Sequence, residues 1–187
     1  YKIKKGKQET YVKDDVELNK YLLQIALENS KLHISKSSPA ISDTAFEKLA
    51  LDYMEIESII SRQSTIYEQE VLEAMGNIKL INAKDSRHDK KLRDYIKLLS
   101  KELNKTLKYR NQDDNSSESI KVCFEPAGPK RKNPSISIIK RKHGAETTKY
   151  ISSSFFSSKD YKTLISNKAK LNDLLKKGAY VSKGDNK

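Results

Sequence analysis

The sequence predicts an α+β protein that combines antiparallel strands, arranged in hairpins, with several long helices in two subdomains. Short segments in which apolar and polar residues alternate are typical of strands with one buried face. Longer segments repeat apolar residues every three or four positions, which is the spacing of an amphipathic helix. Hydrophobic residues form 36% of the 187 residues and can fill a modest core, while charged residues form 33% and suit a well-solvated helical surface.

Two hairpins are expected in the amino-terminal part. Residues 1–13 alternate around Gly6 and Lys7, which favours two short strands joined by a tight turn. Residues 21–34 alternate in the same way around a turn at 28–30, so a second, half-buried hairpin is expected there. The apolar positions of this second hairpin are Leu23, Ile25, Leu27, Leu32 and Ile34.

Two helices are expected next. In residues 42–62 the period changes to three or four, behind a capping box formed by Thr44 and Glu47. The apolar positions of this helix are Phe46, Leu49, Tyr53, Ile56 and Ile60. Residues 67–75 favour a further short helix that ends at Gly76.

A second long helix is expected within residues 85–108. Its last turns carry lysines, which suit the negative end of the helix dipole. Its apolar stripe consists of Leu92, Tyr95, Ile96, Leu99, Leu103 and Leu107. The polar stretch 111–119 that follows contains no apolar residue and predicts a loop at a subdomain boundary.

The carboxy-terminal third predicts strands followed by a helix. Residues 120–125 alternate and are closed by Pro126. Residues 135–142 form a second strand, which a turn at His143 and Gly144 leads into a returning strand through Ile151. A final helix is expected to start at a serine cap, Ser157 or Ser158, and to stop at Gly178 before a short strand at 179–182. These elements divide the chain into a hairpin at 1–20, a helix-rich part at 21–112 and a basic part at 113–187.

The positive charge of the chain is concentrated near its carboxyl end. Residues 1–120 contain 21 Lys and Arg against 20 Asp and Glu, whereas residues 121–187 contain 16 against 5 and so carry +11 of the net charge of +12. Clustered positive charge favours a polyanionic partner, because bound phosphates release counterions. The alternative is a lysine-rich surface that only keeps the protein in solution.

Two basic triplets are the candidate binding residues. They lie in the loop before the strand at 135–142 and at the far end of that strand, and most of them are lysines, which contact phosphate as point charges without reading bases. The prediction is therefore nonspecific contact with the backbone of double-stranded DNA. The candidate DNA-binding residues are Lys130, Arg131, Lys132, Lys140, Arg141 and Lys142. Such contact requires both triplets on one exposed face, and a scattered arrangement favours a structural role instead.

Patterns of catalytic or metal-binding residues are not recognisable. The histidines His33, His88 and His143 lack metal-ligand spacing, and the glycines lack the order of a phosphate-binding loop. Cys123 has no histidine partner at a fixed spacing and is interpreted as structural. An independent hydrolase or nuclease is therefore disfavoured, and catalytic residues, metal ligands and bound cofactors are not expected in this segment.

Several segments resemble the B subunits of bacterial DNA gyrases, which are type IIA topoisomerases. The resemblance begins with Tyr1-Lys2-Ile3-Lys4-Lys5-Gly6-Lys7-Gln8-Glu9 and continues with Tyr11, Lys13, Asp14 and Asp15. Further matching positions are Ile25-Ala26-Leu27, Leu32-His33, Pro39-Ala40, Phe46-Glu47-Lys48-Leu49, Phe124-Glu125-Pro126, His143-Gly144, Leu174-Leu175 and Ala179-Tyr180-Val181. The chain is similar to the end of the Toprim domain together with the long insertion of many Gram-negative gyrases.

The resemblance implies a role within a larger enzyme. The intact enzyme would introduce negative supercoils into DNA at the expense of ATP and with Mg²⁺, and the B subunit would pair with a gyrase A subunit. The family's ATP site, Toprim carboxylates and cleaving tyrosine match no position of this chain, so Mg²⁺ and ATP are expected only for the intact subunit. The rival interpretation is a brace that docks on the rest of gyrase without touching DNA. Its candidate docking aromatics are Phe155, Phe156 and Tyr180, and a core position is an equal alternative for each of them.

The expected location is the cytoplasm. The apolar runs are all much shorter than the roughly 20 residues of a membrane-spanning helix, so a membrane partner is not expected. The basic residues 1–7 are followed by polar residues instead of the apolar stretch of a signal peptide. The single cysteine, Cys123, is consistent with a reducing compartment because it cannot form an internal disulfide.

Overall fold

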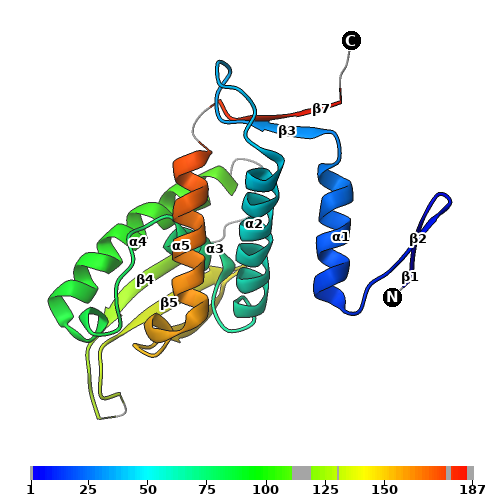
Figure 1. Ribbon diagram of the computed structural model, residues 1–187. Helices are drawn as coiled ribbons and strands as arrows, with labels where there is room; N and C mark the ends of the chain where they lie inside the picture. The colour runs from blue at the N-terminus through cyan, green and yellow to red at the C-terminus, as the bar shows by residue number, and fades with distance from the viewer. Residues whose placement is uncertain (1, 111–118, 130, 176–177, 185–187) are drawn as a thin grey trace. The chain divides into compact units, whose positions relative to one another are not determined.

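A computed structural model describes residues 2–110, 119–129, 131–175 and 178–184 (Figure 1). The chain forms two compact units: unit 1 comprises Tyr1–Met54 and Leu171–Lys187, and unit 2 comprises Glu55–Lys170. The described strands form three antiparallel sheets and occur with long helices, so the α+β class is confirmed.

The boundaries of the two units differ from the expected boundaries, which lay between residues 20 and 21 and between residues 112 and 113. Strand β3 (Ser30–His33) pairs with strand β7 (Tyr180–Lys183), so that Leu32 lies opposite Val181. This pairing joins segments from opposite ends of the chain into unit 1. Periodicity and charge measured along the chain do not reveal such a long-range pairing.

The amino-terminal hairpin of unit 1 is confirmed. Strands β1 (Lys2–Lys5) and β2 (Gln8–Tyr11) pair antiparallel, and Gly6 in the turn between them has a φ of 61°. This left-handed backbone conformation favours glycine because a side chain would clash there.

The second predicted hairpin, at 21–34, is wrong. Most of its first half belongs to helix α1 (Asp15–Leu27), and only β3 forms a strand. The helix begins because the Asp14 carboxylate accepts a hydrogen bond from the Glu17 backbone N–H at 2.9 Å, while the Glu17 carboxylate accepts one from the Lys13 N–H at 2.8 Å. This reciprocal cap satisfies amides that helices otherwise leave without partners at their amino ends.

Loss of the Asp14 cap should unravel the start of α1. None of the side chains of α1 is buried, so packing contributes little to its stability. Asp14→Ala should therefore destabilise the helix by about 1 kcal/mol. Amide hydrogen exchange across Asp15–Leu27 would report the loss as faster exchange. Lys20→Ala, an exposed change in the middle of the same helix, should leave protection nearly unchanged, and equal exchange in both variants would contradict the cap.

The remaining helices largely follow the sequence prediction. Helix α2 (Asp43–Gln63) is confirmed, although its cap is Ser42 instead of Thr44, since the Ser42 Oγ accepts from the Ala45 N–H at 3.3 Å. Helices α3 (Gln69–Gly76), α4 (Asp89–Arg110) and α5 (Lys159–Leu174) are also confirmed, with Ser158 capping α5 through the Tyr161 N–H at 3.1 Å. Short 3-10 helices, Asp85–Arg87 and Phe155–Ser157, precede α4 and α5. The predicted loop at 111–119 lies almost entirely outside the described residues.

Unit 2 is built on a three-stranded sheet with the order β4–β5–β6, formed by Ser119–Glu125, Ser135–Lys142 and Ala145–Ile151. The predicted turn is confirmed: His143 and Gly144 have φ angles of 50° and 80°, which is typical of a two-residue hairpin turn. Figure 1 shows α3, α4 and α5 together in front of these strands.

The core of unit 2 lies between one face of this sheet and the helices. Residues alternate between the two faces of a strand, and the register places the buried apolar positions of all three strands on the same face. These sheet residues are Ile120, Val122, Ile136, Ile138 and Ile151. The helices contribute Leu72, Met75, Leu92, Leu99, Leu103, Tyr161 and Leu164. The opposite face of the sheet, which carries Lys121, Ile139 and Thr148 in one row, is more open.

Candidate nucleic-acid interface

The first predicted basic triplet lies just before β5. Lys130 is outside the described residues. The Arg131 guanidinium stacks 4.2 Å from the centroid of the Tyr150 ring and donates a hydrogen bond to Ser135 Oγ at 3.1 Å. Lys132 is exposed. Arg131 is therefore held against the open face of the sheet, whereas Lys132 is available to solvent.

In the second triplet, Lys140 points to the opposite, helix-covered face. Its Nζ lies 2.9 Å from one carboxylate oxygen of Glu68, and the Nζ of Lys149 lies 2.7 Å from the other. Burial alone would raise the pKa of Glu68, but hydrogen bonds from Lys149 and Lys140 and their positive charges outweigh burial and lower it. The Lys140 charge is thus largely neutralised by a buried carboxylate.

The other two residues of the second triplet are exposed. Arg141 lies on the open face, where its Nε donates to Glu146 Oε2 at 2.5 Å across the β5–β6 pair. Lys142 occupies the end of β5 beside the His143–Gly144 turn. Exposed ion pairs contribute little to stability, so the Arg141–Glu146 pair does not prevent Arg141 from exchanging its partner for a phosphate.

The described members of the two triplets do not share one face. Successive strand residues point to opposite sides of the sheet, so Lys140 and Arg141 diverge. Arg131 contacts Ser135 at the start of β5, and Ser135 lies roughly 20 Å from Arg141 at the usual rise of a strand. Such a scattered arrangement favours a structural role for these residues, and their assignment to DNA binding stays a prediction.

Helix α4 carries a row of lysines that was not among the predicted site residues. Lys90, Lys97, Lys101 and Lys108 are exposed and recur at intervals of 7, 4 and 7 residues, so they line one side of the helix. Averaged over residues 1–120, positive and negative charges nearly cancel, and this average concealed the row. The row becomes apparent when the charged residues of the segment are placed around a helix with 3.6 residues per turn.

Other candidate chemistry is structural in this fold. His33 stacks on Tyr180 with ring centroids 4.6 Å apart, and its ring nitrogens lie 3.2 Å from the Ser38 carbonyl oxygen and the Ser182 hydroxyl. Cys123 is partly buried on β4. Among the described residues, groups of three or more His, Cys, Asp or Glu side chains suited to hold a metal ion are absent. Helices long and apolar enough to cross a membrane are likewise absent from the described part of the chain.

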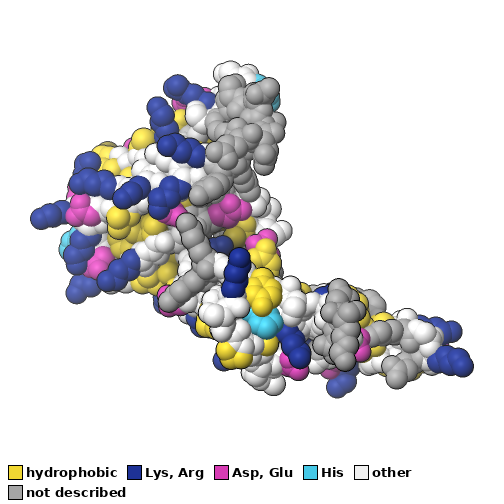
Figure 2. All heavy atoms as spheres, turned by 90° about the horizontal axis from the view of Figure 1, so that it is seen from above, with side chains coloured by type: hydrophobic (Ala, Val, Ile, Leu, Met, Phe, Trp, Pro, Cys, Tyr) yellow, Lys and Arg dark blue, Asp and Glu magenta, His cyan; other side chains and the backbone are white. Residues whose placement is uncertain are grey.

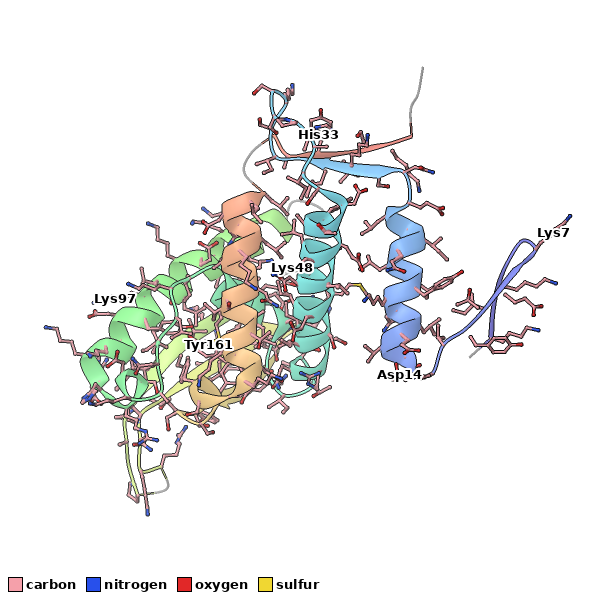
Figure 3. The ribbon with its side chains drawn as sticks, viewed as in Figure 1. Lys7, Asp14, His33, Lys48, Lys97 and Tyr161 are labelled. Carbon is pink, nitrogen blue, oxygen red and sulfur yellow. The ribbon has the colours of Figure 1, made fainter. Side chains whose placement is uncertain are left out.

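Unit 1 contains an apolar groove of about 590 Å³. It lies between α2, the β3–β7 sheet and the last residues of α5, and several of its side chains are substantially exposed. The lining residues are Leu23, Leu32, Phe46, Leu49, Ala50, Tyr53, Met54, Leu171, Leu175, Ala179, Tyr180 and Val181. Exposed apolar surface of this kind commonly marks an interface. Figure 3 shows His33 beside this region, on the β3–β7 sheet.

Comparison with known families gives two matches that follow each other along the chain. Residues 1–27 match the family model described as "GyrB, hook", and residues 30–187 match the one described as "DNA gyrase B subunit insert domain". The first match ends with α1 and the second begins with β3. Both matches define part of a topoisomerase subunit. More particularly, the chain belongs to the family of DNA gyrase B subunit insert domains, joined to the hook segment. The predicted resemblance to a gyrase B subunit with its insertion is thus confirmed.

Proposed function

We propose that this chain serves the B subunit of an ATP-dependent DNA gyrase as an insertion that contacts the backbone of double-stranded DNA without reading its sequence. The intact enzyme would introduce negative supercoils in the cytoplasm, with ATP, Mg²⁺ and the gyrase A subunit supplied outside this segment. The observation that supports DNA contact is the exposure of Lys132, Arg141 and Lys142 on a chain with a net charge of +12.

The physical basis of this contact is electrostatic. Each lysine or arginine that neutralises a phosphate releases condensed counterions, so the observed binding constant falls as salt rises. Lys132 lies before β5, whereas Arg141 and Lys142 lie at the far end of this strand, and each would add one such contact. Lys140 contributes less because Glu68 already holds its charge.

A salt titration tests this function directly. Binding of the 187-residue chain to a labelled random-sequence duplex would be followed by fluorescence anisotropy from low to moderate salt. The variant Lys132→Gln/Arg141→Gln/Lys142→Gln should bind more weakly, and the slope of log K against log salt should fall by about 0.9 per lost contact. Lys140 stays unchanged in this variant because its replacement would disturb the buried pair with Glu68.

A matched variant separates local contact from total charge. Lys20→Gln/Lys36→Gln/Lys48→Gln removes three exposed charges from unit 1 and should keep the wild-type slope. If the wild-type chain fails to bind duplex even at low salt, the proposed DNA contact is refuted.

A second function, bracing the gyrase complex, is supported by the groove of unit 1. Tyr53, Tyr180 and Val181 line it and are 50%, 44% and 54% exposed, respectively. Covering such apolar side chains with another part of gyrase would be favourable. Absence of DNA binding in the salt titration would favour this function over DNA contact.

A further inference from the structure

We infer that the lysine row of α4, formed by Lys90, Lys97, Lys101 and Lys108, is the principal surface through which this chain holds the backbone of duplex DNA. The inference rests on the DNA contact proposed above and assigns it to residues outside the two basic triplets. The four side chains are exposed, and their positions 0, 7, 11 and 18 along the helix fall within an arc of about 40° around its axis.

The row points directly away from the core. The buried residues of α4 lie on the opposite side of the helix, and they are Leu92, Tyr95, Ile96, Leu99 and Leu103. Figure 3 shows Lys97 on the side of α4 that faces away from α5, and Figure 2 shows many Lys and Arg side chains on the part of unit 2 at the left of both views. The row therefore faces solvent along its whole length.

The dimensions of the row suit a polyanion with regularly spaced charges. Eighteen residues of helix span about 27 Å, and the gaps between successive lysines are about 10, 6 and 10 Å. A duplex presents one phosphate per 3.4 Å of axis on each strand, so a row of this length runs alongside several phosphates. Four point charges on long flexible side chains can each reach one of them.

Helix stability accounts for Lys108, which lies in the last turn near the negative end of the helix dipole, but not for the other three lysines. Lys90 lies in the first turn, where a positive charge opposes the helix dipole. Lys97 and Lys101 are like charges four residues apart, which repel each other on a helix surface. Asp94 offsets Lys97 in part, at 3.2 Å, but both side chains are well exposed and such pairs are weak. Lys90, Lys101 and Lys108 form no ion pair with any other described residue.

The composition of the row favours nucleic acid over a protein partner. Protein–protein interfaces are depleted in lysine and are anchored by aromatic, methionine and arginine side chains. The four basic residues of the row are all lysines, and Asp94 pairs with one of them, Lys97. Lysines without such an anchor fit sequence-independent contact with phosphates.

The test compares four forms of the 187-residue chain on one labelled duplex over a salt series. These are the wild type, the row variant Lys90→Gln/Lys97→Gln/Lys101→Gln/Lys108→Gln, the triplet variant Lys132→Gln/Arg141→Gln/Lys142→Gln, and a control with equal loss of charge, Lys20→Gln/Lys31→Gln/Lys36→Gln/Lys48→Gln. For the row variant, the slope of log K against log salt should be smaller in magnitude by about 3 to 4 than for the wild type. Its binding at low salt should be at least tenfold weaker. The control should remain close to the wild type.

Each outcome bears on a different claim. If the wild type fails to bind duplex DNA, both the proposed DNA contact and the inference about the lysine row are refuted. A wild type that binds and a row variant that binds equally well would leave the DNA contact standing and overturn the inference. Equal weakening in the row variant and in the control would also overturn it, because binding would then depend on total charge. Thermal unfolding of the row variant, expected to match the wild type, checks that the exposed changes leave the fold intact.

Discussion

Replacing Glu68 with glutamine should lower the free energy of unfolding by about 3 kcal/mol. Glu68 is buried, with 10% of its side chain exposed, and its two oxygens hold Lys140 of β5 and Lys149 of β6. The amide of glutamine leaves two lysines beside a neutral group in a partly buried site. Breaking this ion network is costly because Lys140 and Lys149, with 21% and 36% of their side chains exposed, both lose the carboxylate that they contact. Urea denaturation followed by circular dichroism would measure the change.

The same carboxylate gives stability a defined dependence on pH. The lysines hold the pKa of Glu68 below its ordinary value of 4.5, so folding favours the ionised form. The resulting stabilisation is fully present above the pKa of the unfolded chain and is lost as pH falls through the folded pKa. The wild type should therefore lose more stability than Glu68→Gln on acidification from about pH 6 to about pH 3. Parallel losses in the two proteins would contradict this account.

Two further variants separate charge loss from a general effect of substitution. Glu57→Gln removes an exposed carboxylate and should change stability by less than about 0.5 kcal/mol. The triple variant Glu68→Leu/Lys140→Met/Lys149→Met replaces the whole network with apolar side chains and should recover much of the loss, because no charge is then left buried. A triple variant as unstable as Glu68→Gln would assign the loss to packing.

The elements predicted correctly are those whose signals are local. The turns at Gly6 and at His143–Gly144 have few alternative conformations, and the apolar stripes of α2 and α4 repeat over many turns. Local sequence reveals such elements because the residues that set a turn, or the apolar stripe that packs against the core, recur within the segment itself. The family matches agree with the resemblance recognised from short motifs along most of the chain.

Helix α1 was predicted wrongly because its sequence satisfies two patterns at once. Leu23, Ile25 and Leu27 alternate as in a strand, but Leu18, Tyr21, Leu22 and Ile25 also recur at helical spacing. The cap at Asp14 starts the helix upstream of the alternating segment. The partner of β3 is β7, about 150 residues later, and nothing near β3 in the sequence announces that pairing.

The candidate site was only partly predictable for a similar reason. Basic residues that are adjacent in the sequence form a cluster of charge along the chain. In a strand, however, their side chains point to opposite faces, as those of Lys140 and Arg141 do. A helix does the reverse and aligns residues that are seven positions apart, as it does for the lysines of α4. Secondary structure therefore decides which charged residues lie on the same surface, and composition alone does not reveal secondary structure.

Phe156→Ala should destabilise the protein by about 4 kcal/mol, because Phe156 is 1% exposed and its removal leaves a cavity in a packed core. Its ring meets Tyr161 and Tyr95 edge to face, with centroids 5.2 and 5.8 Å apart. Tyr161 in turn accepts a hydrogen bond from the Ile81 N–H at 3.1 Å, so the cavity would loosen a buried polar contact as well. Chemical denaturation would measure the loss, and Phe156→Leu should lose clearly less.

The stability of Phe156→Ala also distinguishes a packing role in the core from a docking role for this aromatic residue. The sequence left docking on a brace and a place in the core as equal alternatives for Phe155 and Phe156. Both are buried in unit 2, at 6% and 1% exposure, so the core alternative holds for them. A docking residue affects assembly when changed but leaves the isolated fold nearly as stable. Of the three aromatics, only Tyr180 is exposed enough for that behaviour, and Tyr180→Ala should cost about 1 kcal/mol, mainly from its lost stacking on His33. A Phe156→Ala variant as stable as the wild type would contradict the packing role assigned to Phe156.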